Sequence, residues 1–332
     1  KLSLADQLVE FVDRDLGLRQ VEEWASKGTY PVQVVYGPEG CGKTAWLRQS
    51  AELLRELGFE VIYVNPLNKL ALAEISIGSL REKLLKLVEE AISQNALARI
   101  AWIAYSVAYD VIKSTRGKIA VIIDDAFQVI GVRESAMYVK ALLNLIEYPP
   151  EHYERIVTVT ATSEGVSLRE VGRHRWAETT PMWNMTRDGF KQLYEQLPGD
   201  KPDFDTIWRV TGGNPAMLER LYRASWDVDS VIKNLIREKN ITPSFIKRWA
   251  NHLEEAINDP DHLWKPDTPE ELVNELIERN LIMYFLPNRD QKFWIDQPPP
   301  ERDPELGIGK YVAWQTPLHK EAVRRALEWV RP

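Results

Sequence analysis

The sequence predicts an α/β protein built on a parallel sheet, followed by a helical segment and a closing segment of mixed helices and strands. Three observations lead to this prediction. A complete G-x-x-x-x-G-K-T pattern occupies residues 37–44, between a short apolar run and a helical pattern. A second apolar run, residues 119–123, ends in two adjacent carboxylates, Asp124 and Asp125. From Asp188 onward, strand-like runs give way to amphipathic helical patterns.

The stretch 37–44 has the context that a phosphate-binding loop requires. Residues 32–36 are typical of a buried strand, and apolar residues recur at helical spacing over residues 44–57. Glycines let backbone N–H groups turn inward around a phosphate, and the following helix adds its positive end. We therefore predict that Lys43 reaches the β- and γ-phosphates of a nucleoside triphosphate and that the Thr44 hydroxyl ligates Mg²⁺. The predicted nucleotide-contacting residues of this stretch are Gly37, Pro38, Glu39, Gly40, Cys41, Gly42, Lys43, Thr44 and Ala45.

Length and composition limit the class of protein. The chain has 332 residues, enough for about two domains, and its 44% apolar and 27% charged residues are ordinary for a globular protein. Neither a run of about 18 apolar residues nor a signal-peptide pattern occurs, so we expect a cytoplasmic protein without membrane association. The single cysteine, Cys41, is in keeping with a reducing compartment. A net charge of −7 offers no general basic field for nucleic acid.

The segments on either side of the loop helix add one candidate residue and four elements. Arg14 precedes a short helical pattern at residues 18–26, where an arginine could lie beside a nucleotide base or a phosphate, or else on the solvated surface. Beyond the loop, residues 61–65 predict a second strand, and residues 78–93 and 96–113 predict two long helices.

The carboxylates Asp124 and Asp125 supply the second nucleotide signal. A buried strand that ends in acidic residues places them at the edge of an open α/β sheet where ligands bind. We predict that Asp124 holds Mg²⁺ through water and that Asp125 positions or deprotonates the attacking water. Acidic pairs after strands are common, but a phosphate loop about 80 residues upstream makes this pairing specific.

Three further residues are candidates for the γ-phosphate. Residues 133–146 predict a helix, and residues 155–163 predict a strand that ends in hydroxyl residues, among which Thr160 is placed to sense the γ-phosphate or to cap its own turn. Arg173 and Arg175 follow on a predicted loop. Mobile guanidinium groups there are candidates for stabilising charge in the transition state.

The second half of the chain reads first as helices and then as a mixed segment. The turn 211–215 places Pro215 at the first position of a helix that begins a predicted lid. Residues 281–285 and 311–314 are strand-like, and a long proline-rich segment, 287–310, lies between them. The predicted helices are 188–197, 203–210, 215–225, 228–239, 242–257, 268–279 and 317–330. Helix, helix, strand, wing and strand is the order of a winged helix.

Together these motifs resemble the archaeal ATPase family, a member of the STAND class of signal-transduction NTPases that is related to the AAA+ ATPases. The resemblance covers nearly the whole chain. It rests on the phosphate loop, on Asp124 and Asp125 with Phe127-Gln128 after them, on the strand that ends in hydroxyl residues, on Gly212-Gly213-Asn214-Pro215 and on Trp314-Gln315-Thr316-Pro317-Leu318.

This resemblance implies ATP or ADP with Mg²⁺ as ligands, and a sheet in which the strand ending near Thr160 separates the loop strand from the Asp124 strand. It also implies that Pro215 lies near the adenine and that Arg14 matches the arginine of an N-terminal adenine-binding box. Asp13 stands where that box usually has glycine. Asp125 stands where many AAA+ relatives have glutamate, which predicts slow hydrolysis.

We therefore expect a P-loop ATPase that acts as a nucleotide-controlled switch, with an ATPase core at 1–185, a helical lid at 186–240 and a winged helix at 241–332. Its partner would be an unidentified protein or a second copy. Three alternatives remain: an origin-recognition-like ATPase that remodels DNA, a small-molecule P-loop kinase, and a nucleotide-binding scaffold without turnover.

The charges of the predicted winged helix disfavour DNA. Residues 268–279 would enter the major groove in a winged-helix DNA reader, yet they contain four glutamates and one arginine. Residues 241–332 carry 12 Lys and Arg against 16 Asp and Glu, a net charge of −4. A small basic face on the last helix is the exception, made by Lys320, Arg324 and Arg325.

Overall fold

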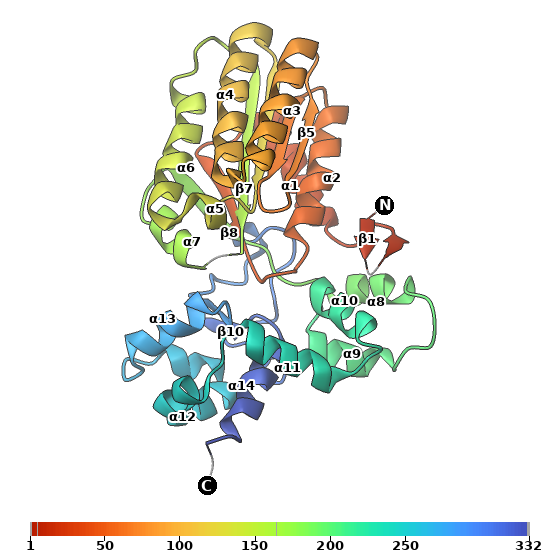
Figure 1. The fold of residues 1–332 in the computed structure, drawn as a ribbon, viewed down its shortest axis with the longest axis vertical. Coiled ribbons are helices and arrows are strands. Elements are labelled where there is room, and N and C mark those ends of the chain that lie inside the picture. The colour runs from red at the N-terminus through yellow and green to blue at the C-terminus, as the bar shows by residue number, and fades with distance from the viewer. Residues whose placement is uncertain (1, 5, 164, 331–332) are drawn as a thin grey trace. The chain divides into compact units, whose positions relative to one another are not determined.

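The structure is a computed structural model that describes residues 2–4, 6–163 and 165–330. Residues 1, 331 and 332, at the outer limits of the predicted core and winged helix, lie outside the described residues. The chain divides into two compact units (Figure 1). The sheet unit comprises Asp15–Tyr36 and Lys43–Pro181, and the helical unit comprises Lys1–Arg14, Gly37–Gly42 and Met182–Pro332.

The sheet unit contains one six-stranded sheet, in the order β5-β4-β6-β7-β3-β8, and every neighbouring pair is parallel except β4 with β5. The central strands are apolar and buried along their length, which is the pattern of a parallel sheet covered on both faces. The strands are β3 (Val32–Tyr36), β4 (Glu60–Asn65), β5 (Leu70–Glu74), β6 (Lys118–Asp124), β7 (Arg155–Thr162) and β8 (Ala177–Pro181).

The strand order confirms the arrangement that the family resemblance implied. Strand β7 pairs with β3 on one side and with β6 on the other, so it separates the loop strand from the Asp124 strand. Strands β5 and β8, at the two edges, were not predicted. Both are short and partly exposed, so they lack the continuous apolar run that marks the central strands.

Helices cover the sheet and complete its core. Helices α3 and α4 pack side by side, and their apolar residues join those of the central strands in one buried cluster. Helices α1 and α2 meet through Trp24 and Trp46, whose ring centroids are 6.1 Å apart in an edge-to-face contact. The helices are α1 (Asp15–Lys27), α2 (Lys43–Glu56), α3 (Gly78–Ser93), α4 (Leu97–Thr115), α5 (Phe127–Ile130), α6 (Val132–Glu147) and α7 (Gly165–Gly172).

The helical unit is made mostly of short capped helices. Several begin at a residue whose side chain accepts a hydrogen bond from the first turn, as Asn214 does for α10 and Thr316 for α14. The helices are α8 (Arg187–Glu195), α9 (Phe204–Thr211), α10 (Pro215–Arg223), α11 (Val228–Glu238), α12 (Pro243–Asn258), α13 (Glu270–Glu278) and α14 (Pro317–Leu327), with 3-10 helices η1 (Pro260–Trp264) and η2 (Gln291–Phe293).

Two small two-stranded antiparallel sheets complete the helical unit: β1 (Leu2–Leu4) with β2 (Gln7–Val9), and β9 (Ile282–Tyr284) with β10 (Val312–Trp314). The order α12, α13, β9, β10 is the order on which the winged-helix prediction rests, and the assignment to that fold stays a prediction. Within the described residues, no helix combines the length and apolarity needed to cross a membrane.

Candidate functional site

The phosphate loop follows β3 and leads directly into α2, as the sequence predicted. Lys43 is the first residue of α2 and is buried, and Thr44 and Ala45 complete its first turn half-buried. The first N–H groups of a helix have no intrahelical partner, so they and the helix dipole favour an anion at this end. In the sheet unit, the start of α2 therefore has the chemistry of a phosphate site.

Asp124 is the last residue of β6 and is fully buried. Its Oδ2 atom accepts hydrogen bonds from the Tyr63 hydroxyl and from Asn65 Nδ2, each at 2.9 Å. Burial raises the pKa of the Asp124 carboxyl. The rise is opposed by the side chains of Thr44, Tyr63 and Asn65 and by the positive charge of Lys43. The structure thus brings together the predicted residues Lys43, Thr44 and Asp124.

The second oxygen of Asp124 has the properties expected of a Mg²⁺ ligand. Its Oδ1 atom is buried and, among the described residues, has no hydrogen-bond partner. A buried carboxylate oxygen left in this state is costly unless a cation or water meets it. No group of three or more His, Cys, Asp or Glu side chains in the described ranges could hold a metal by itself. A site made of one carboxylate, one hydroxyl and substrate phosphates is the arrangement that Mg²⁺ commonly uses.

Asp125 stands just beyond the strand in a left-handed backbone conformation, with φ of 47°. Aspartate tolerates this region better than most residues. Its N–H donates to the carbonyl of Ala161 at the end of β7, 3.1 Å away, and the residue is half-buried. Backbone contacts therefore fix the place of Asp125, next to the buried Asp124.

Thr160 lies inside β7 rather than at its end. It pairs in register with Ile123 of β6 and Val34 of β3, and it is fully buried. Strand β7 continues to Thr162, which is level with Tyr36, the last residue before the phosphate loop. Thr162 is thus a second hydroxyl residue nearer the strand end, and sequence reasoning did not single it out.

Arg173 and Arg175 lie in the turn between α7 and β8, and both are exposed. The Arg173 guanidinium pairs with Glu170 at 3.1 Å, and its side chain is 72% exposed. The structure leaves both arginines at the surface, so their predicted service to the γ-phosphate stays a prediction.

The residues of the phosphate loop that belong to the helical unit are held by two motifs from the second half of the chain. The Glu39 N–H donates to Gln315 Oε1 at 2.8 Å, and the Glu39 carbonyl accepts from Asn214 Nδ2 at 2.9 Å. Ala216 N–H donates to the Gly40 carbonyl at 3.3 Å, and a Cβ atom at Gly40 would lie 2.2 Å from that of Ala216. Gly40 is therefore required where α10 meets the loop.

Pro215, at the first position of α10, lies between Asn214 and Ala216, which both contact the phosphate loop. Asn214 and Gln315 themselves were not predicted as site residues, although both belong to motifs that carried the family resemblance. Tyr63 and Asn65 were also missed. Polar residues at the end of the buried strand β4 were the available signal for them.

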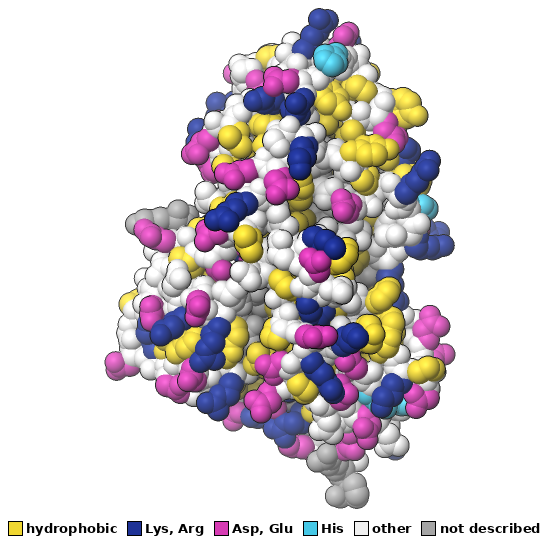
Figure 2. Space-filling model, turned by 180° about the vertical axis from the view of Figure 1, so that it is seen from behind, with side chains coloured by type: hydrophobic (Ala, Val, Ile, Leu, Met, Phe, Trp, Pro, Cys, Tyr) yellow, Lys and Arg dark blue, Asp and Glu magenta, His cyan; other side chains and the backbone are white. Residues whose placement is uncertain are grey.

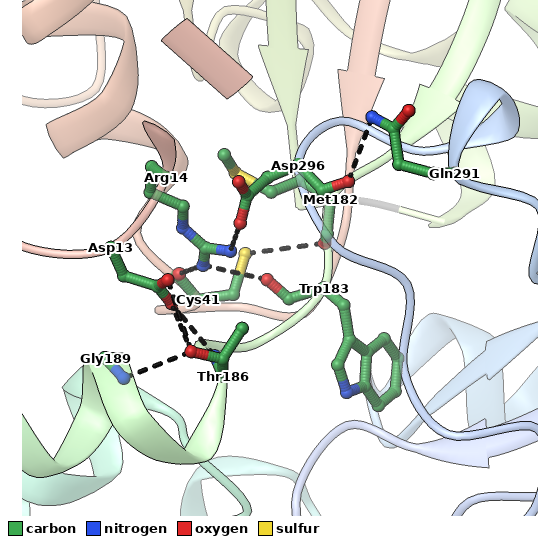
Figure 3. Close-up of polar contacts among 9 residues, drawn as sticks. All are labelled: Asp13, Arg14, Cys41, Met182, Trp183, Thr186, Gly189, Gln291 and Asp296. Carbon is green, nitrogen blue, oxygen red and sulfur yellow. Dashed lines mark hydrogen bonds and ion pairs between the residues drawn. The ribbon is translucent and has the colours of Figure 1, made fainter. Parts of the chain in front are cut away.

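Arg14 is buried within the helical unit (Figure 3). Its guanidinium donates to the Cys41 carbonyl at 2.6 Å and to the Trp183 carbonyl at 2.9 Å, and it pairs with Asp296 at 3.2 Å. The structure therefore gives Arg14 three protein partners and excludes the solvated surface position that the sequence had left open. Contact of Arg14 with adenine stays a prediction.

The model of a family described as "ATPase domain predominantly from Archaea" matches residues 11–221. The match includes the phosphate loop, the Asp124 strand and the Pro215 turn. Comparison with curated protein sequences found no relative.

Several solved structures are similar in fold at low sequence identity. The Aeropyrum pernix ORC1 protein in complex with DNA is 15% identical, with a TM-score of 0.40 over 97% of this chain and 93% of that chain. Cdc6p from Pyrobaculum aerophilum is 14% identical, with a TM-score of 0.38 over 96% and 95% of the two chains. AMPPCP-bound DnaA from Aquifex aeolicus is 14% identical, with a TM-score of 0.38 over 82% and 79%. At this level of similarity they say nothing about function.

Proposed function

This chain belongs to the family of ATPase domains found predominantly in Archaea, and from that premise we propose that it is an ATP-hydrolysing switch of the STAND type. In this proposal the bound nucleotide, ATP or ADP, sets the arrangement of the rest of the chain. That arrangement controls access for a protein partner or a second copy.

The proposal rests on the proximity of Lys43 and Thr44 to Asp124 in the sheet unit. A lysine and a hydroxyl residue at the start of α2 act on a buried carboxylate at the end of β6, and that carboxylate keeps one oxygen without a protein partner among the described residues. A lysine suits the β- and γ-phosphates, and a hydroxyl with a carboxylate suits Mg²⁺. A merely structural aspartate would gain from a partner for both oxygens.

In the proposed reaction, Thr44 and Asp124 would hold Mg²⁺, which would supply positive charge to the phosphates. Lys43 donates to the β- and γ-phosphate oxygens. Asp125 accepts a proton from water as the water oxygen bonds to the γ-phosphorus, and the bond from that phosphorus to the β–γ bridging oxygen breaks, which releases ADP and inorganic phosphate. Aspartate reaches less far than glutamate, so we expect slow turnover.

Contacts within the helical unit support the switch. The phosphate loop takes its Glu39 contacts from Asn214, before α10, and from Gln315, before α14. Lys239, which follows α11, also pairs with the Glu39 carboxylate, at 2.5 Å. A change in the loop that accompanies nucleotide binding would therefore disturb contacts with three separate elements of this unit.

Charges in the helical unit disfavour the DNA-remodelling alternative. Helix α13 carries Glu270, Glu271, Glu275 and Glu278. The two arginines beside it, Arg248 and Arg279, are already paired with Glu275, at 3.4 and 3.1 Å. Figure 2 shows lysine and arginine side chains interspersed with aspartate and glutamate over the face that it displays. An acidic helix would be repelled by duplex phosphates, so we propose a protein partner for this segment.

Phosphate release from ATP by the purified protein tests the proposed function. We expect slow turnover that requires Mg²⁺ and that duplex DNA does not change at about 0.15 M salt. Absence of both ATP binding and phosphate release would overturn the proposal. Stimulation by a duplex bound with submicromolar affinity, and lost on charge reversal within α13, would instead support the DNA-remodelling alternative. Transfer of the phosphoryl group to a small molecule rather than to water would support a kinase.

A further inference from the structure

The ion pair between Arg14 and Asp296 joins residues 282 positions apart in the chain. Both side chains are almost completely buried, at 3% and 2% exposure. The same guanidinium group donates to the carbonyls of Cys41 and Trp183 (Figure 3). A buried charge pair is costly to desolvate, so a role in stability alone is a weak explanation for it. One of its contacts lies inside the phosphate loop.

The backbone around the pair is held in uncommon conformations. Asp13, Arg14 and Asp296 all have positive φ, at 63°, 80° and 62°. For residues other than glycine such values persist where the surrounding structure imposes them, and they cluster at functional sites. Asp13 is anchored through its carboxylate, which accepts from the Thr186 N–H at 2.9 Å. A Cβ atom at Gly189 would lie within 2.5 Å of the Asp13 side chain, so glycine is required there.

The segment that supplies Asp296 is also fixed. Trp294 is fully buried, its Nε1 donates to the Asn288 carbonyl at 2.8 Å, and its ring meets Trp183 edge to face with centroids 6.5 Å apart. Ile295 forms a β-bridge with Met182. The sequence predicted that residues 294–296 lie in a proline-rich wing, residues 287–310. In the structure, residues 294–296 are buried within the helical unit.

The Cys41 carbonyl contact determines how the phosphate loop presents an N–H group. The peptide bond between Cys41 and Gly42 is planar, so a carbonyl held by Arg14 points the Gly42 N–H in the opposite direction. Gly42 has φ of 102°, a conformation in which glycine adds little resistance to a flip of this peptide. The Arg14 contact at 2.6 Å supplies the restraint that Gly42 itself does not.

We propose that Arg14 and Asp296 are positioning residues for nucleotide binding: Asp296 orients the Arg14 guanidinium, and Arg14 fixes the Cys41–Gly42 peptide so that the Gly42 N–H serves the bound phosphate. This inference rests on the proposed ATP site. According to this proposal, the buried segment 294–296 contributes to the affinity for the nucleotide. ATP and ADP share the β-phosphate that the loop would hold, so the pair acts on both nucleotides alike.

Calorimetric titration of the full chain with Mg²⁺-ATP and Mg²⁺-ADP tests this. Asp296→Asn keeps the side-chain shape and tolerates positive φ, and Arg14→Lys keeps the charge but not the fork of donors. We expect each variant to raise both Kd values about tenfold or more. The double variant should bind the nucleotides no more weakly than the single variant that binds them less tightly. The matched control is Asp259→Asn, which removes the exposed pair with Arg302 and leaves both Kd values unchanged.

Wild-type Kd values in both single variants would overturn this inference alone. A loss confined to ATP, or losses that add in the double variant, would also overturn it. If the wild-type protein bound neither nucleotide, the proposed function would fail and this inference with it. Hydrogen exchange of the wild-type chain needs no variant: saturating ADP should slow exchange of residues 291–296 more than that of residues 257–263, and unchanged exchange there beside a protected phosphate loop would contradict the coupling.

Discussion

The two adjacent carboxylates Asp124 and Asp125 differ in almost every physical respect. Asp124 is fully buried, takes two hydrogen bonds on one oxygen and has none on the other among the described residues. Asp125 is half-buried and has a left-handed backbone beside β7. A buried carboxylate with an available oxygen suits a cation, and a more accessible one suits a water molecule.

Replacing each carboxylate should separate binding from hydrolysis. Asp124→Asn should weaken Mg²⁺-dependent ATP binding, because it removes the charge that would meet the cation. Asp125→Asn should keep ATP bound and slow its cleavage, because a group that orients water acts mainly on the transition state. Calorimetry and phosphate release on the same preparations measure the two effects. Equal loss of binding in both variants would show that the division of roles is wrong.

The exposed arginines of the α7–β8 turn need a separate test. Arg173→Ala and Arg175→Ala should leave nucleotide affinity unchanged, and at least one should lower turnover by about 10³-fold or more, as measured arginine fingers do. The experiment should be run over a range of protein concentrations, since an arginine can act on a neighbouring copy. Normal turnover in both variants would assign the two residues to the solvated surface.

At this scale the sequence predicted the residues whose motifs are contiguous and missed those that act through long-range contacts. Lys43, Thr44 and Asp124 stand in recognisable local patterns, and the structure brings them together. Gln315 contacts the loop from 276 positions away, and Asn214 does so from 175. No local pattern records such pairings, because they arise only when the chain is folded.

Among elements, the sequence predicted the central strands and most helices well, since their apolar periodicity is strong. The runs at 119–123 and 155–163 became β6 and β7, and the helical patterns of the second half became α8 to α14. Hairpin β1–β2, edge strands β5 and β8, and the short helices α5 and α7 were missed. Each is short or half-exposed, so packing rather than local sequence decides its conformation.

We predict that the stability of the protein depends on pH through His319, in the first turn of α14. His319 is buried there, and its Nδ1 lies 2.8 Å from the Thr316 hydroxyl. Burial lowers the pKa of His319 to about 3, the charges of Lys239 and Arg220 act in the same direction, and Glu39 opposes them. An unfolded histidine has a pKa of about 6.5. The stabilising effect of a neutral His319 is therefore complete above about pH 6.5 and is lost as pH falls toward 3.

Urea unfolding at pH 7 and pH 5 measures this dependence. The free energy of unfolding of the wild-type protein should fall between these two values by about 2 kcal/mol more than that of His319→Gln, because the variant lacks the proton uptake. His152→Gln, at an exposed position, is the control and should behave as the wild type does. An identical pH dependence in His319→Gln and the wild-type protein would contradict the assignment.

For the whole molecule, the compact units do not follow the chain in simple order. The helical unit collects residues 1–14 and 37–42 with residues 182–332, so six of the eight residues of the phosphate loop belong with elements from the second half of the sequence. The predicted division at 185 and 240 cuts the chain into consecutive pieces and stays a prediction. The interleaved units would give the proposed nucleotide-controlled switch a physical basis, because a change in the loop would alter its contacts in the helical unit.

A calorimetric comparison of two lysine variants tests whether Mg²⁺-ATP binds at the phosphate loop. Lys43→Ala removes the charge-assisted hydrogen bonds expected with the β- and γ-phosphates, each contributing about 1.5–3 kcal/mol, so the Kd for ATP should rise by about a hundredfold or more. Lys27→Ala, at the exposed end of α1, is the matched control and should bind as the wild type does. Wild-type affinity in a folded Lys43→Ala protein would contradict binding at this loop.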